Sequence, residues 1–256
     1  MGTLLLRLAA PLQSYGADSK FNTRRTRDMP TKSAVVGMLA AALGRRRGEA
    51  LDDLTALRFG ARADQPGREV VDYQTITPFP DEVSDTRKAR KGKAPKKIKP
   101  DVLDIIYRHY IEDAVFVVGV EGDDGKLREL EDALRHPVFQ LYLGRRSCPP
   151  QLPLILGIRD VPLEAALAEE PWQAGSRVRV DAGSEVQLRV QMDANGMAPG
   201  CTVIHDAPVS FSSMRREYAP RVVEELTVRI RTKAGLEAGE TQQEQAVHDP
   251  FAELSD

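Results

Sequence analysis

The chain has 256 residues, of which 41% are hydrophobic and 29% charged, and its formal net charge is −2. This composition excludes collagen-like, disordered and membrane-embedded proteins and indicates a globular protein that can bury a sizeable core. The two cysteines are far apart and the four histidines lack ligand spacing, so we expect no metal and no cofactor. The apolar N-terminal run is short and lacks a basic start, and we expect a cytoplasmic protein.

Charge is distributed unevenly along the chain. Residues 1–148 contain 26 Lys and Arg against 21 Asp and Glu, a net +5, whereas residues 149–256 contain 10 against 17, a net −7. Eight basic and no acidic residues lie between Thr86 and Lys99. The asymmetry favours an anionic partner for the N-terminal part, although a solvated charged loop explains the basic cluster equally well.

Apolar patterning predicts most elements of residues 1–150. The first helix should begin after Thr31 or Ser33, either of which can cap it, and end before Gly44. The expected strands are Thr3–Ala9, Leu57–Ala63, Glu69–Thr77, Ile105–Val120 and Phe139–Leu143, and the second helix is Lys126–Arg135. The order matches a ferredoxin-like βαββαβ domain, an arrangement that RNA-recognition domains share. Residues 78–107 would be an insertion in its middle hairpin.

The remaining residues favour a smaller β-rich unit over residues 151–236, so the predicted fold class is α+β. A short helix is expected near Pro162–Ala168, with strands around Arg177–Val180, Glu185–Met192 and Leu226–Arg231. Residues 237–256 carry six acidic and no basic side chains, and we expect an acidic, flexible tail there.

No strong catalytic motif is present in the sequence: a Walker loop, a dinucleotide fingerprint and a nucleophile elbow are all missing. Metal-free RNA cleavage stays open, because it needs only an acid or base near the 2′-hydroxyl and cations around the phosphate. His109, with Tyr107 and Tyr110 beside it, could supply this chemistry. Strand alternation explains the same residues without chemistry, with Tyr107 and His109 on one face and Tyr110 on the other.

Several basic segments are better interpreted as binding elements. The turn Gln13–Gly16 combines an amide, a hydroxyl and an aromatic ring, and the turn Gly144–Ser147 presents two guanidinium groups. Arg and Lys bind phosphates, and tyrosine stacks on unpaired bases. Arg45–Arg47 are interpreted instead as cations that suit the carboxyl end of the first helix. Together these features predict a protein that binds single-stranded nucleic acid.

Six segments carry a family resemblance. They are Leu4–Gly16 (LLLRLAAPLQSYG), Thr23–Thr26, Pro30–Ala42 (PTKSAVVGMLAAA), Asp72–Thr75 (DYQT), Arg108–Val118 and Tyr142–Pro149 (YLGRRSCP). With them the chain resembles the CasD subunit family of the type I-E CRISPR Cascade, within the RAMP superfamily. The resemblance implies a non-catalytic subunit that binds and caps the 5′ handle of the CRISPR RNA in antiviral defence. Its partners would be that RNA, the repeated backbone subunit, the large subunit and, through the complex, target DNA.

The resemblance also implies a thumb, formed by the hairpin insertion, that displaces a base at the handle–spacer junction. The predicted RNA-binding residues are Gln13, Ser14, Tyr15, Gly16, Arg24, Arg25, Thr26, Lys32, Ser33, Tyr73, Thr75, Arg108, Tyr142, Gly144, Arg145, Arg146 and Ser147. The predicted thumb cations are Arg87, Lys88, Arg90, Lys91, Lys93, Lys96, Lys97 and Lys99. The alternatives are a metal-independent endoribonuclease that processes repeat RNA and a general single-strand binder.

Overall fold

A computed structural model describes residues 1–16, 22–76, 104–180, 182–212 and 214–232. In chain order the elements are β1 (Gly2–Gln13), β2 (Tyr15–Gly16), β3 (Thr23–Arg24), β4 (Thr26–Arg27), α1 (Lys32–Ala42), α2 (Asp52–Thr55), β5 (Arg58–Gln65), β6 (Arg68–Ile76), β7 (Asp104–Gly122), α4 (Asp124–Arg135), β8 (Ile155–Arg159), α5 (Leu163–Glu169), α6 (Ser176–Val180), β9 (Glu185–Asp193), β10 (Thr202–Phe211) and β11 (Arg216–Arg231). The fold is therefore α+β and rich in sheet, as expected.

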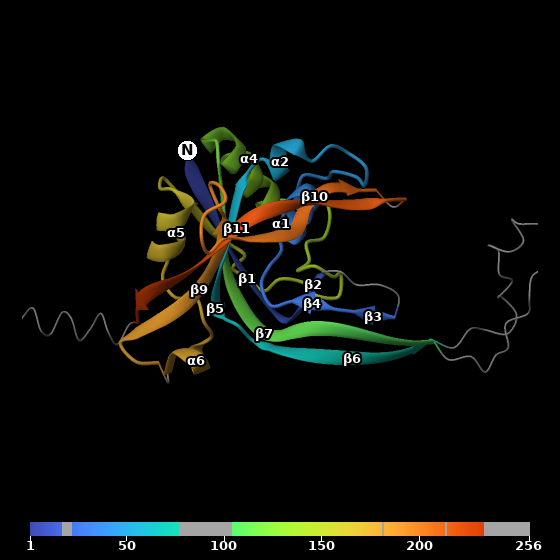
Figure 1. The fold of residues 1–256 in the computed structure, drawn as a ribbon, viewed down its shortest axis with the longest axis horizontal. Helices are drawn as coiled ribbons and strands as arrows, with labels where there is room; N and C mark the ends of the chain where they lie inside the picture. The colour runs from blue at the N-terminus through green and yellow to red at the C-terminus, as the bar shows by residue number, and fades with distance from the viewer. Residues whose placement is uncertain (17–21, 77–103, 181, 213, 233–256) are drawn as a thin grey trace, which may run out of the picture.

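A nine-stranded sheet, in the order β10-β11-β9-β5-β7-β1-β8, forms the body of the protein, and β3 and β6 attach to β7. Strand β7 is 19 residues long and organises the sheet. Its first half pairs with β6 and β3, and its second half lies between β1 and β5 (Figure 1). The β6–β7 hairpin therefore extends away from the helices, as the ribbon shows.

Helices cover both faces of this sheet because its central strands are apolar on both faces. Leu4, Leu6 and Phe116 belong to the larger core cluster, into which α1, α2 and α4 pack their apolar residues. Leu5 and Val117 point to the other face and pack with α5 in a second cluster. Burial on both faces explains why β1 and β7 contain near-continuous hydrophobic runs rather than simple alternation.

The prediction for helix α1 is confirmed. Thr31 is the N-cap residue, and its hydroxyl accepts a hydrogen bond from the Ala34 amide at 3.3 Å. Leu43 ends the helix, and Gly44 follows with φ of +77°, a conformation that favours glycine. Helix α4 is confirmed as well, and Asp123 is its N-cap residue.

Two predicted strands are wrong. Phe139–Leu143 forms a loop, and the strand after α4 is β8, which pairs antiparallel with β1. Leu141 and Leu143 are buried although they lie in a loop. The alternation of apolar residues that predicted a strand therefore comes from a loop that packs on the core. Arg177–Val180 lies in α6, and none of that helix is buried. Short apolar runs of this kind do not distinguish a strand from other structure.

The C-terminal strands continue the same sheet. Strand β9 confirms Glu185–Met192, and β11 is longer than the predicted Leu226–Arg231. Strand β9 pairs with β5, so sheet hydrogen bonding runs across the expected boundary at residue 150. The division into two units stays a prediction. Helix α5 confirms the short helix near Pro162–Ala168.

Two predicted regions fall largely outside the described residues. They are the acidic tail, residues 237–256, and the thumb cations between Arg87 and Lys99. Residues 104–107, which the prediction included in the insertion, are the first four residues of β7. No helix within the described ranges is long and apolar enough to cross a membrane.

Candidate nucleic-acid interface

A groove of about 600 Å³ lies where α1, the loop after α4 and the β10–β11 hairpin meet. Strand β10 passes close to α1 at this place (Figure 1). Its lining residues come from four parts of the chain: Gly16, Thr31, Ser33, Ala34, Gly37, Ala40 and Ala41; Arg45, Arg46, Arg47, Glu49 and Leu51; Phe139, Gln140, Tyr142, Gly144 and Arg146; Phe211, Arg216 and Tyr218. The groove therefore depends on the tertiary fold.

The groove is strongly cationic. Arg46, Arg47, Arg146 and Arg216 line it, and none of them forms an ion pair with another described residue. Arg45 differs, because it pairs with Asp53 and donates to the Ala50 carbonyl at 2.8 Å. These four guanidinium groups share one concave surface with a single carboxylate, Glu49, so the surface attracts an anionic polymer and can bind its phosphates.

Aromatic rings lie among these arginines. Phe139 and Tyr142 come from the loop after α4, and Phe211 and Tyr218 come from the β10–β11 hairpin. Phe139 and Tyr218 are 45% and 44% exposed, so their rings are accessible to a ligand. Exposed rings beside arginines are the combination with which proteins hold single-stranded nucleic acid, through stacking and phosphate contacts.

The Gln13–Gly16 turn adjoins the groove, and most of its side chains are buried. The Gln13 side chain is fully buried and donates to the Ala114 carbonyl at 2.7 Å. Tyr15 is buried too, its hydroxyl donates to the Gln13 side-chain oxygen, and burial raises the pKa of its phenol well above the ordinary value. Ser14 donates to the His109 carbonyl at 3.0 Å. Only Gly16 of this turn is exposed, and it lines the groove.

Lys32 and Thr26 also have internal partners. The Lys32 ammonium group pairs with Asp193 at 2.8 Å, and the residue is 7% exposed. The Thr26 hydroxyl accepts a hydrogen bond from the Tyr15 amide at 2.8 Å and so fixes β2 against β4. Ser33 differs from both, because it lines the groove and is half-buried.

The turn Gly144–Ser147 brings predicted site residues together. Gly144 has φ of +81°, and a Cβ atom there would lie 1.7 Å from the Ser14 carbonyl oxygen. Arg145 lies over the Tyr110 ring at 4.5 Å and donates to the Arg24 carbonyl at 2.9 Å. The turn is therefore packed against both the end of β1 and strand β3. Within the same turn, the side chains of Arg146 and Ser147 are exposed.

Electrostatics at Tyr110 reflect this packing. Burial alone would raise the pKa of the phenol, but hydrogen bonds from Ser147 and Arg145 outweigh it and lower the pKa below its ordinary value. Among the described residues, buried guanidinium nitrogens remain without a partner at Arg108 Nε, Arg145 Nη1 and Arg27 Nε. A buried donor without an acceptor costs free energy.

The β6–β7 hairpin separates the candidate nuclease residues. Tyr107 packs edge-to-face against Tyr73 with ring centroids 5.7 Å apart. The His109 imidazole contacts the Glu69 carboxylate on the neighbouring strand. Tyr110 is buried, and its ring is covered by Arg145. The alternation therefore gives one face Tyr107 and His109 and the other face Tyr110, so the three do not form one cluster.

The remaining predicted positions are divided between the groove and the strands outside it. Thr75 is exposed on β6, Arg25 is exposed next to β3, and Tyr142 is half-buried at the groove. The thumb cations lie outside the described residues. Within the described part of the chain, no group of three or more His, Cys, Asp and Glu side chains is arranged to hold a metal ion.

Sequence reasoning missed the far wall of the groove. Phe211, Arg216 and Tyr218 come from a hairpin whose first strand was not predicted. Arg46 and Arg47 were interpreted as helix-terminal charges, but α1 ends at Ala42 and both side chains line the groove. One signal in the sequence could have indicated this wall. The run Arg215-Arg216 lies two residues before Tyr218, so basic side chains and an aromatic ring occur together.

These features define a sheet-rich α+β protein with an arginine-lined groove and accessible aromatic rings. Residues 3–224 match the family model described as CRISPR-associated protein (Cas_Cas5). The chain therefore belongs to the CRISPR-associated Cas5 family, and the expected relation to CasD is confirmed. It is 34% identical over 188 residues to the CRISPR system Cascade subunit CasD of Escherichia coli (strain K12). That match covers 66% of this chain and 77% of the relative.

Solved structures agree with this assignment. A chain of a CRISPR RNA-guided surveillance complex superposes with a TM-score of 0.74 at 32% identity, over 90% of this chain and 91% of that chain. A crystal structure of a Cas protein superposes with a TM-score of 0.64 at 34% identity, over 91% of this chain and 99% of that one. The likeness therefore extends over most of the described fold.

Proposed function

We propose that this protein is a non-catalytic subunit of a CRISPR RNA-guided surveillance complex and that its groove binds the 5′ handle of the CRISPR RNA. The observation that carries the proposal is the groove itself, in which four arginines without ionic partners among the described residues lie beside accessible aromatic rings. The similarity to a Cascade subunit supports the identity of the RNA. The partners proposed with it are the repeated backbone subunit and the large subunit, with target DNA reached through the complex.

The proposed path of the RNA follows the arginines. Arg46, Arg47 and Arg216 hold phosphates within the groove, and Arg146 continues the cationic surface to the Gly144–Ser147 turn. From there Arg24 and Arg108 lead to the β6–β7 hairpin. In this proposal Gln13, Tyr15 and Lys32 position the surface from within, because their polar groups already have internal partners.

The ferredoxin-like arrangement and the thumb belong to the same proposal. Strands β8, β1, β7 and β5 are neighbours in that order, and each neighbouring pair is antiparallel. This is the order expected of a βαββαβ unit in which β5 and β8 are the second and fourth strands. The residues of the proposed thumb lie between β6 and β7 in the sequence, and in this proposal the thumb meets the handle–spacer junction.

The proposed non-catalytic role predicts that the protein binds RNA without cleaving it. We expect the purified protein to shift repeat-derived handle RNA on a native gel and to leave it intact on a denaturing gel, both in EDTA. The reason is that the three candidate side chains do not converge on one phosphate: His109 contacts Glu69, and Tyr110 lies on the opposite face of β7 under Arg145. A discrete cut that disappears in His109→Ala would replace this proposal with a metal-independent endoribonuclease.

Salt dependence tests the groove itself. Arg146→Ala is expected to shallow the slope of log affinity against log salt by about 0.7, the value for one phosphate of a single strand. Titration of the labelled handle RNA at several salt concentrations measures the slope. The matched control is Arg128→Ala, because Arg128 is exposed on α4 and does not line the groove. Equal slopes for wild type and Arg146→Ala would exclude this residue from the interface.

A further inference from the structure

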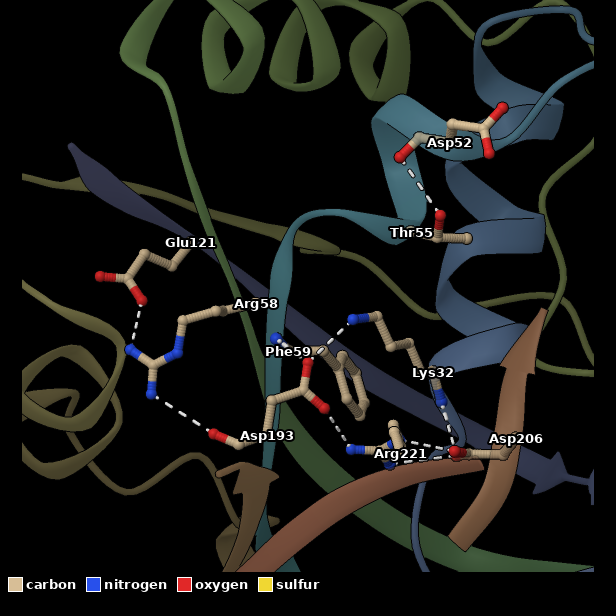
Figure 2. A network of polar contacts seen from close by, with 9 residues as sticks. All are labelled: Lys32, Asp52, Thr55, Arg58, Phe59, Glu121, Asp193, Asp206 and Arg221. Carbon is tan, nitrogen blue, oxygen red and sulfur yellow. Dashed lines mark hydrogen bonds and ion pairs between the residues drawn. The ribbon is translucent and has the colours of Figure 1, made fainter. Parts of the chain in front are cut away.

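A buried ionic network lies at the foot of the β10–β11 hairpin. Asp206 of β10 accepts from the Arg221 guanidinium at 2.5 and 3.1 Å, and Arg221 also pairs with Asp193 at 2.7 Å. Lys32 pairs with Asp193 at 2.8 Å, and its backbone amide donates to Asp206 at 3.0 Å. Figure 2 shows these four side chains converging between α1 and the C-terminal strands.

The network joins parts of the chain that are distant in sequence. Asp193 ends β9 and also accepts from the Phe59 amide of β5 at 3.0 Å, while Arg58 donates to its carbonyl. The Arg221 guanidinium lies over the Phe59 ring at 5.2 Å. Two cations and two carboxylates balance in charge, so the assembly can remain ionised although its side chains are largely buried.

A register shift of the hairpin directs Asp206 into the network. The pairing of β10 with β11 shifts between His205 and Ala207, which leaves Asp206 outside the regular ladder. Such bulges redirect a side chain and bend the strand that carries them. Beyond the bulge the hairpin reaches the groove, and a Cβ atom on Gly37 of α1 would lie 3.6 Å from the ring of Phe211.

The hairpin is therefore held to α1 at two points. At its foot Asp206 accepts from the Lys32 backbone amide, and Asp193 of β9 forms ion pairs with both Lys32 and Arg221. Near its tip Phe211 lies beside Gly37. The far wall of the groove, Arg216 and Tyr218, follows directly after that tip. Among the described residues, β10 and β11 form no direct ion pair with α1, so the link at the foot passes through the Lys32 amide and through Asp193. The network consequently determines how far Arg216 and Tyr218 stand from the α1 side of the groove.

We propose that Lys32, Asp193, Asp206 and Arg221 are positioning residues that set the width of the RNA groove by fixing the β10–β11 hairpin on α1. This inference rests on the proposed function, since it concerns the same groove. None of the four side chains lines the groove, so each acts on the ligand through the hairpin. Single-stranded RNA then contacts Arg216 and the α1 side at once only when the network is complete.

The test is a double-mutant cycle between the network and the groove wall. Asp206→Asn keeps the size of the side chain but removes one of the two carboxylates. We expect Arg216→Ala to weaken binding of the handle RNA by about tenfold in the wild type, the effect of a charge-assisted hydrogen bond. In the Asp206→Asn background we expect Arg216→Ala to have less than about a threefold effect, because Arg216 is no longer held against the RNA.

A control separates positioning from general loss of stability. Asp64→Asn disturbs a carboxylate that is 2% exposed and paired with Arg62 on the face of α5, opposite the groove. In that background Arg216→Ala should keep its full effect. Affinities are compared at a temperature where circular dichroism shows all variants folded. If Asp206→Asn does not fold, Lys32→Met replaces it, because Arg221 then still holds both carboxylates and only the ion pair between α1 and Asp193 is lost.

Each outcome has a distinct meaning. Equal, additive effects of Arg216→Ala in the wild-type and network backgrounds would overturn the positioning role while leaving the groove as the RNA site. No effect of Arg216→Ala in the wild type, together with no effect of Arg146→Ala, would overturn the proposed function and this inference with it. Loss of the Arg216 effect only in network variants supports the inference.

Discussion

Replacing Gly144 with alanine is expected to disrupt the turn that connects the groove to the rest of the interface. The new Cβ atom would lie 1.7 Å from the Ser14 carbonyl oxygen, a distance that backbone atoms cannot accept without moving. The residue also has φ of +81°, where an L side chain is strained by about 1–2 kcal/mol. With an overpacking cost of about 1–3 kcal/mol, we expect a total loss of about 3 kcal/mol.

The expected loss extends to RNA binding, because the turn also holds Arg145 and Arg146. Urea unfolding measures the stability, and titration of the handle RNA measures the affinity. Gly200→Ala is the matched control, since Gly200 has φ of +92° but a Cβ atom there would have nothing within 4 Å. It should cost only about 1 kcal/mol and leave RNA affinity unchanged. Equal losses in the two variants would show that the contact with Ser14 relaxes freely.

Removing the buried Arg62 side chain is expected to destabilise the whole sheet. Arg62 is 0% exposed and forms a two-point ion pair with Asp64 at 2.6 and 2.9 Å. Its remaining donors reach the carbonyl oxygens of Leu167, Glu170 and Pro171 at the end of α5. All five guanidinium N–H groups are thus used, and Arg62→Met would leave a buried carboxylate and three carbonyls without this partner. We expect a loss of about 3–5 kcal/mol.

The single tryptophan of the chain reports on this change directly. Trp172 donates through its indole N–H to the Asp64 backbone carbonyl at 2.8 Å, so its fluorescence follows the same region during denaturant unfolding. Arg189→Met is the matched control, because Arg189 pairs with Asp28 and the two side chains are 42% and 75% exposed. That control should cost no more than about 1 kcal/mol. A loss below that value in Arg62→Met would contradict the structural role assigned to the pair.

Elements with strong local signals were predictable from the amino-acid sequence. Helix α1 followed from Thr31, the spacing of its apolar residues and Gly44, because caps and helical periodicity are local properties. Strands β1, β5, β6 and β7 were predictable for the same reason, as was the basic, aromatic character of the Gly144 turn. The family followed from residues that stand together in the chain, such as YLGRRSCP.

Which of these residues face a ligand depends on the tertiary structure. Gln13, Tyr15 and Lys32 have the side-chain types of RNA contacts, yet each is buried with an internal partner. Arg46 and Arg216 are 170 positions apart in the sequence and line one groove. Whether a side chain is buried, and which ionic partner it has, depends on strands that are distant in sequence and pair in the sheet, such as β5 with β9. The local sequence pattern does not show which distant strands pair.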